Sequence, residues 1–374
     1  MTVRRSTPAW VVGVTGLAIG VVIVLRILIP SGMDPTTFLT LGEDSPAQVS
    51  YAQDVLGDVA TRDDMGHDGK FFFAQANDPW YLEPEVNASV LDRPTYRGRR
   101  MLYPMIAGGF GLFPPGLVVW SLLVTNLLAL GAGSFLAALL AERWGATVWL
   151  GLAVPLNIGL LFELYIDGAG IVAYVCCLGA LYSLLKGRTW TAALLFAAAC
   201  LSREVMIGFA LGVLVLRWLD ERRFLWRIVI APLVAMVAWN AYLWFRLKGV
   251  SGVGGGLEAV TAPFLGLFEA FRSWGNDLSY LVVDLAMLVI AVLFVPLALR
   301  SRSPIAWGAF PFVVLTILLS VHVWREPFDL SRALAPVLTA APFLLLVPKS
   351  GQVSPRVGHL PRGPACRFVR ATHR

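Results

Sequence analysis

Long apolar runs, separated by short polar breaks, are the feature that most limits how this chain can fold. The chain has 374 residues, of which 57% are hydrophobic and only 14% are charged, whereas soluble domains carry roughly 25% charged residues. A helix of about 20 apolar residues is long enough to cross a bilayer. The sequence therefore predicts an all-α, polytopic transmembrane helical bundle of about 10–11 segments, some short or re-entrant. It excludes an ordinary cytosolic enzyme, a disordered scaffold and a secreted disulfide protein.

The net charge of +6 could suggest nucleic-acid binding, but the distribution of the basic residues argues against it. Arginines gather between apolar runs, as at Arg222, Arg223 and Arg227, and the tail from Lys349 onward contains no acid. Cytoplasmic loops of membrane proteins carry this excess of positive charge. We therefore expect a multi-pass protein of the cell membrane with cytoplasmic N- and C-termini, membrane lipids around it and no nucleic-acid partner.

The polar segments divide the chain into six parts. Segment 30–98 holds twelve of the 24 acidic residues, and such a loop after an Arg-flanked first helix should lie outside the cytoplasm. The predicted parts are a first transmembrane helix (1–29), an external acidic loop with interfacial helices (30–98), a core transmembrane block (99–245), an external loop (246–277), C-terminal transmembrane helices (278–347) and a basic cytoplasmic tail (348–374).

Two stretches of the core block leave alternatives open. Segment 99–113 is short, rich in glycine and followed by Pro114 and Pro115, which indicates a partial or re-entrant helix. Residues 189–218 form either two short helices that break at Arg203 or one long helix. The long helix would place a charge at mid-membrane, which is costly, so we expect the break.

The first candidate for chemistry is the loop motif from Gly66 to Ala74, which contains His67, Asp68 and Lys70 and leads to Asp78. A general base needs a carboxylate held close to the group that it deprotonates, and Asp68 beside an aromatic run fits that need. The alternative without a catalytic role is an acidic loop with an aromatic membrane anchor.

Arginines in unusual places are the second candidate. Arg97, Arg99 and Arg100 precede an apolar segment on the expected external side, and arginine binds phosphate through a planar fork of donors. The alternative is anchoring to lipid headgroups. Arg203 and Glu204 occupy the break between two apolar segments, where ionisable residues are functional candidates, although they could also pair with each other in a turn.

Further acids and histidines give weaker signals. Asp167, with Glu163 nearby, lies at the external end of an apolar segment, where it is either functional or a simple helix cap. His67 and His322 leave a divalent metal as an open alternative, but their spacing matches no ligand motif, and we expect no cofactor. The external ends of the last segments carry four charged residues that could equally be solvated: Asp284, Arg325, Glu326 and Arg332.

The order of these motifs resembles the GT-C superfamily of membrane glycosyltransferases, including protein O-mannosyltransferases, lipid A aminoarabinose transferases and bacterial cell-surface glycopolymer proteins. In these families a loop acid is followed by an aromatic and then a small residue, as in Asp68, Phe72 and Ala74. A basic residue precedes the next helix, as do Arg99 and Arg100. The chain departs from the pattern at Lys70, where relatives carry glutamine, and at His67, which replaces a paired acid.

The resemblance implies inverting transfer of a mannose- or arabinose-type sugar from a polyprenyl-phosphate carrier to a glycan, lipid or protein acceptor on the external face. It implies Asp68 and Asp167 as catalytic residues and Arg99, Arg100 and Arg203 as ligands of the donor phosphate. The expected supporting residues are His67, Lys70, Asp78, Glu204 and Arg332. A transporter or lipid flippase, and a non-enzymatic subunit of an envelope complex, are the alternatives.

Overall fold

A computed structural model of the chain describes residues 7–250, 261–273 and 278–347. The predicted basic tail at 348–374, and the glycine-rich part of the loop at 246–277, lie outside the described residues. Within them the protein is helical, and its strands are limited to two short segments, β1 (Leu41–Gly42) and β2 (Thr61–Arg62), which pair in parallel. The all-α class predicted from the sequence is confirmed.

Among the described residues, four helices are long and apolar enough to cross a membrane: α1 (Ala9–Leu28), α7 (Pro115–Arg143), α12 (Arg227–Leu247) and residues Ser279–Arg300 of α14 (Leu278–Arg300). A fifth span forms if α17 (Pro327–Ala333) and α18 (Ala335–Leu346), which are bent by 63°, count as one. Three shorter apolar helices are α9 (Gly170–Leu185), α10 (Thr189–Ser202) and α15 (Pro304–Ile317). The described helices are consistent with a membrane protein, and they account for part of the predicted bundle of about 10–11 segments, some short or re-entrant.

One apolar run that the sequence predicts as a single segment is divided, because a side chain within it begins a new helix. The run at 146–164 is divided into η3 (Val148–Ala153) and α8 (Ile158–Tyr165). Between them lie Pro155 and Asn157, and the Asn157 side chain accepts hydrogen bonds from the amides of Gly159 and Leu160. A side chain that satisfies the free amides in this way begins a new helix, so hydropathy alone overestimates the length.

The two open alternatives in the core block are settled. Segment 99–113 contains only α6 (Leu102–Ala107) and η2 (Gly109–Gly111), and six helical residues are too few to cross a bilayer. Arg203 has an extended backbone between the end of α10 and η4 (Glu204–Met206), which leads into α11 (Ile207–Glu221). The alternative of one long helix over 189–218 is therefore wrong.

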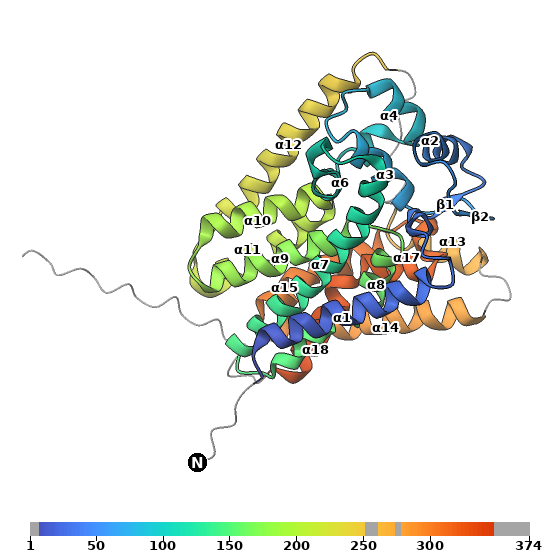
Figure 1. Cartoon of the computed structure of the whole chain (residues 1–374). Helices are drawn as coiled ribbons and strands as arrows, with labels where there is room; N and C mark the ends of the chain where they lie inside the picture. The colour runs from blue at the N-terminus through green and yellow to red at the C-terminus, as the bar shows by residue number, and fades with distance from the viewer. Residues whose placement is uncertain (1–6, 251–260, 274–277, 348–374) are drawn as a thin grey trace, which may run out of the picture.

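Close packing of small residues brings α1 against α7. A Cβ atom on Gly16 of α1 would lie 2.1 Å from Ser134 Oγ, and one on Gly13 would lie 2.9 Å from Phe135 Cβ. Glycines of this kind let apolar helices approach closely where packing, rather than the hydrophobic effect, holds them together. α1 lies along α7 in Figure 1.

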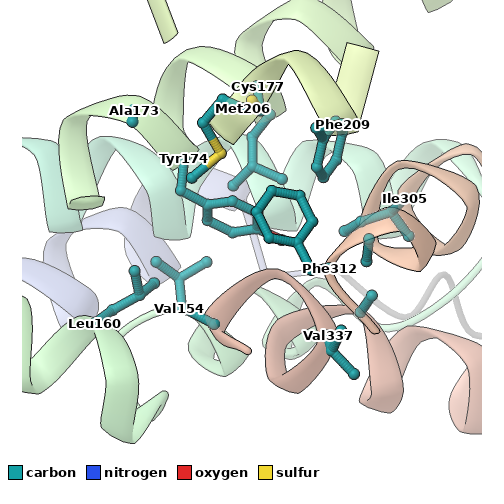
Figure 2. Close-up of a cluster of buried hydrophobic side chains, with 14 of the residues drawn as sticks. Val154, Leu160, Ala173, Tyr174, Cys177, Met206, Phe209, Ile305, Phe312 and Val337 are labelled. Atoms are coloured by element: carbon teal, nitrogen blue, oxygen red, sulfur yellow. The ribbon is translucent and has the colours of Figure 1, made fainter. Parts of the chain in front are cut away.

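The core between the helices is made by aromatic and aliphatic side chains from segments far apart in sequence. Figure 2 shows Tyr174 of α9, Phe209 of α11 and Phe312 of α15 in one cluster. The Tyr174 and Phe209 rings meet edge to face with centroids 6.1 Å apart. This cluster fixes how α9, α11 and α15 sit, and the candidate site lies at their ends.

The polar segment after α1 folds into short helices at one end of the bundle (Figure 1). They are η1 (Pro35–Leu39), α2 (Pro46–Leu56), α3 (Gly69–Asn77), α4 (Pro84–Val90) and α5 (Pro94–Arg97). The C-terminal end of α12 holds this group in place, because Trp239 Nε1 donates to the Gly98 carbonyl at 2.7 Å and Arg246 Nε donates to the Tyr81 carbonyl at 2.8 Å. α13 (Leu265–Ser273) and α16 (Val321–Trp324) complete the described elements.

Candidate functional site

A cavity of about 530 Å³ lies where the polar segment 30–98 meets the ends of α10, α15 and α17. We call it the arginine pocket. Four carboxylates line it, from Asp68, Asp92, Glu204 and Asp329. Its lining contains six arginines: Arg93, Arg97, Arg99, Arg100, Arg203 and Arg332. The structure thus brings most of the predicted charged residues together, although up to 264 sequence positions separate them.

Asp68 lies at the start of α3 between two guanidinium groups. Its Oδ1 accepts from Arg97 at 2.6 Å and its Oδ2 from Arg332 at 2.7 Å. Burial alone would raise the pKa of this carboxyl group, but the charges of Arg97 and Arg332 outweigh burial and hold the pKa well below its usual range. Asp68 is therefore ionised, and both of its oxygens are occupied, when the pocket contains no ligand.

Arg332 connects three carboxylates. It donates from Nε to Glu163 at 2.8 Å and from Nη1 to Asp329 at 2.8 Å, in addition to its bond with Asp68. Glu163 of α8 is 1% exposed and also accepts from Arg203 at 2.6 Å and from the Gly170 amide at 2.9 Å. One buried carboxylate therefore positions two of the pocket's arginines.

Arg100 and Glu204 form a two-pronged pair across the pocket. Arg100 Nε and Nη2 donate to the two Glu204 oxygens, each at 3.0 Å, which is the planar geometry that arginine favours with carboxylates. The alternative in which Arg203 and Glu204 satisfy each other in a local turn is wrong, since each pairs with a residue on another segment.

Arg99 differs from the other predicted phosphate ligands. It lines the pocket, but within the described residues it forms no ion pair, and its buried Nε has no hydrogen-bond partner. A buried donor without a partner is costly, and an anion in the pocket would satisfy it.

Part of the lining of the arginine pocket is apolar. It is formed by Phe312 and Leu315 of α15, by Leu319, and by Val323 of α16. The lining of the cavity therefore offers both cations and hydrocarbon, which an amphiphile with an anionic head requires.

Four predicted site residues do not line the arginine pocket. Asp167 is fully buried, with φ of 47° and no hydrogen-bond partner for its oxygens among the described residues. Lys70 is tied to Ser45 Oγ at 2.7 Å and to a backbone carbonyl. Asp78 accepts from the amides of residues 82 and 83 and from one amide side chain. His67 packs edge-on against an aromatic ring of α8, with centroids 5.3 Å apart.

Arg97 and Glu163 hold the site together, but neither is among the site residues predicted from the sequence. Arg97 lies in the arginine motif, but spacing alone did not separate it from Arg99 and Arg100. Glu163 is an acid inside an apolar run, and such a residue is itself a sign of a functional or paired charge. The position of Glu163 within an apolar run is therefore the sequence signal that points to it.

The described residues contain no group of three or more His, Cys, Asp and Glu side chains that could hold a metal ion. Asp284, for which solvation was one option, is instead buried in α14 at 1% exposure, while Arg325 and Glu326 are exposed. Comparison of the chain with models of protein families, with curated proteins and with solved structures found no match.

Proposed function

We propose that the protein is a membrane glycosyltransferase of GT-C type, which transfers a sugar from a polyprenyl-phosphate carrier to an acceptor on the external face. The observation that carries this proposal is the convergence of Asp68 with Arg99, Arg100, Arg203 and Arg332 around one cavity that also has an apolar wall. A phosphate attached to a long hydrocarbon chain matches both halves of that cavity.

The donor phosphate binds at the arginines. Arg99 is the first contact because it has no competing partner within the described part of the chain. Arg100 and Arg203 lie beside it and are each held by one carboxylate. The leaving group of the reaction is a phosphate, whose growing charge requires fixed cations, and preorganised donors of this kind supply a few kcal/mol to the transition state.

Asp68 acts as the general base. The acceptor hydroxyl attacks the anomeric carbon, the new glycosidic bond forms, and the bond to the phosphate oxygen breaks with inversion. The hydroxyl proton passes to Asp68, and the bonding electrons leave with the polyprenyl phosphate. An incoming phosphate also interacts with the arginines that face Asp68. Their electrostatic stabilisation of the Asp68 carboxylate is then weaker, so the carboxylate is a stronger base when the donor is bound.

The roles of other residues follow from their contacts. Glu163 and Glu204 position arginines and need not touch the substrate. Asp167, Asp78, Lys70 and His67 have no part in the proposed chemistry because they do not line the pocket. The proposed catalytic and substrate-binding residues are therefore fewer than the family resemblance implies: they are one carboxylate and the arginines around it.

The test is transfer by the purified full chain from labelled polyprenyl-phosphate mannose and polyprenyl-phosphate arabinose, with release of the sugar to water measured alongside. Asp68→Asn should lower turnover by about 10²–10⁴-fold. The matched control is Asp54→Asn, which neutralises an exposed carboxylate on α2 of the same external segment and should leave turnover unchanged. Near-normal turnover by Asp68→Asn, or turnover of neither donor by the wild type, would refute the proposal.

A further inference from the structure

A second, smaller cavity of about 300 Å³ lies between α2, α3 and α4, and we call it the α2–α4 cavity. Half of its lining residues are apolar. The polar residues in its lining are Tyr51, Asn77, Asp78, Glu83 and Asn87. In contrast to the arginine pocket, neither lysine nor arginine lines it. The two cavities therefore suit ligands of different charge.

The polar wall of the α2–α4 cavity is held rigidly. The Asp78 carboxylate accepts from the Leu82 amide at 2.8 Å, from the Glu83 amide at 2.9 Å and from Asn87 Nδ2 at 2.7 Å. The Tyr51 ring packs edge-on against Phe73, with centroids 6.1 Å apart. Groups fixed in this way can bind a ligand without first being ordered, which lowers the cost of binding.

The groups that face the cavity are mainly hydrogen-bond acceptors. Within the described residues the Glu83 carboxylate has no hydrogen-bond partner, and the amide side chains offer carbonyl oxygens. Burial, and then the charges of Asp78 and Glu83, raise the pKa of Tyr51 to about 12, so its hydroxyl stays protonated and can donate. Carboxylates in a lining that contains neither lysine nor arginine repel a phosphate, whereas a neutral ligand rich in hydroxyl donors satisfies them.

The cavity is connected with the proposed catalytic site by both of its walls. α3 runs from Asp68, in the arginine pocket, to Asn77, in the α2–α4 cavity. The nine residues of α3 rise about 14 Å, so a chain of a few sugar units can span the separation. On the other wall, Val90 of α4 lines the cavity, and Asp92, two residues later, lines the arginine pocket.

We propose that the α2–α4 cavity binds the neutral saccharide of a glycan acceptor and holds its terminal hydroxyl toward Asp68. The acceptor role rests on the proposed transferase function, whereas saccharide binding by the cavity does not. The apolar wall, which includes Val55 and Val86, contacts the C–H faces of the sugar rings, and the acceptor oxygens of Glu83 and Asn87 take hydrogen bonds from its hydroxyls.

The test is calorimetric titration of the full chain in detergent with neutral disaccharides of mannose, of arabinose and of glucose, and with glucosamine and undecaprenyl phosphate as separate ligands. Val86→Trp places an indole at the cavity from a position that is 41% exposed, so it should fold normally. The matched control is Val234→Trp, at a 61% exposed position of α12. Tyr51→Phe removes one hydroxyl without changing the shape.

We expect saturable binding of at least one neutral disaccharide, weakened at least tenfold by Val86→Trp and a few-fold by Tyr51→Phe, with undecaprenyl phosphate binding unchanged in all variants. Binding of no disaccharide, binding of glucosamine alone, or disaccharide binding that both cavity variants leave unchanged would overturn the inference. If a disaccharide binds at the cavity but undecaprenyl phosphate does not bind at all, the cavity proposal survives and the transferase proposal fails.

Discussion

Replacing Glu163 with glutamine should destabilise the protein strongly, although the two side chains have almost the same shape. Glu163 is 1% exposed and is the carboxylate that Arg203 contacts at 2.6 Å and Arg332 at 2.8 Å. A glutamine can keep the hydrogen bond from the Gly170 amide only by turning its own NH₂ group toward the two guanidinium groups. Donors then face donors in a buried place.

The size of this destabilisation depends on which of the two arginines keeps a carboxylate partner. Arg332 still has Asp68 and Asp329, each within 2.8 Å. Arg203 loses its ion pair with Glu163, which is the only one that the structure gives it among the described residues. Removing one member of a buried pair and leaving the other charged typically costs about 3–5 kcal/mol, so we expect Glu163→Gln to lower the free energy of unfolding by that amount.

The assay is equilibrium unfolding of the purified chain in mixed micelles, followed by tryptophan fluorescence. The matched control is Glu142→Gln, which changes an exposed glutamate near the end of α7 and should stay within about 0.5 kcal/mol of the wild type. The double variant Glu163→Gln with Arg203→Gln removes both charges. It should be more stable than Glu163→Gln alone, because no unpaired charge is left buried.

Two results would refute this reasoning. A loss below about 1 kcal/mol in Glu163→Gln would mean that Arg203 finds another partner or water. A double variant that is no more stable than Glu163→Gln would mean that the cost comes from packing and not from an unpaired charge.

Three further predictions concern pH, loop position and backbone strain. Burial opposes ionisation of Asp68, but its two arginine partners hold the pKa of the carboxyl group well below the ordinary value. The contribution of Asp68 to stability is therefore complete above the ordinary pKa and is lost only as pH falls through the lower pKa of the folded state. The difference in unfolding free energy between the wild type and Asp68→Asn should therefore stay constant from pH 7 to about 4 and shrink below it, and a decline already at pH 5 would contradict this. Trp239→Phe removes the 2.7 Å hydrogen bond to the Gly98 carbonyl and should lower the free energy of unfolding by about 0.5–1.5 kcal/mol. It should also weaken the binding of undecaprenyl phosphate several-fold, as measured by titration. Gly66→Ala should lower the free energy of unfolding by at least about 1–3 kcal/mol, because Gly66 has φ of 66° and a Cβ atom there would lie 2.0 Å from the Thr40 carbonyl oxygen. Thermal unfolding of the variant at the wild-type temperature would disprove this.

The sequence was sufficient to single out Asp68, Arg100 and Arg203, which line one cavity in the structure, because charges beside or between apolar runs need a reason to be there. It could not predict their partners. Arg332 meets Asp68 across 264 positions, and Glu163 meets Arg203 across 40. Such pairings depend on how the helices pack, whereas periodicity shows only which face of a helix is apolar.

The differences between the predicted and the observed arrangement also have physical causes. The hydropathy of residues 146–164 predicts one segment, because hydropathy does not show that the Asn157 side chain caps the start of a new helix. Asp78 and Lys70 carry charges in the right loop, but each is used to hold the backbone of that loop. Asp167 lies at a helix end, where either a cap or a pocket was compatible with the pattern, and the structure buries it with its backbone in the left-handed region.

The most direct test of the account is photo-crosslinking with a polyprenyl phosphate that carries a diazirine in its hydrocarbon tail, followed by mass mapping of the labelled residues. The arrangement of the arginine pocket predicts labels on Phe312, Leu315 and Val323, which form its apolar wall, and loss of these labels in Arg99→Gln. Labels spread evenly over the exposed faces of α1 and α14, and unchanged in Arg99→Gln, would contradict a phosphate site at these arginines.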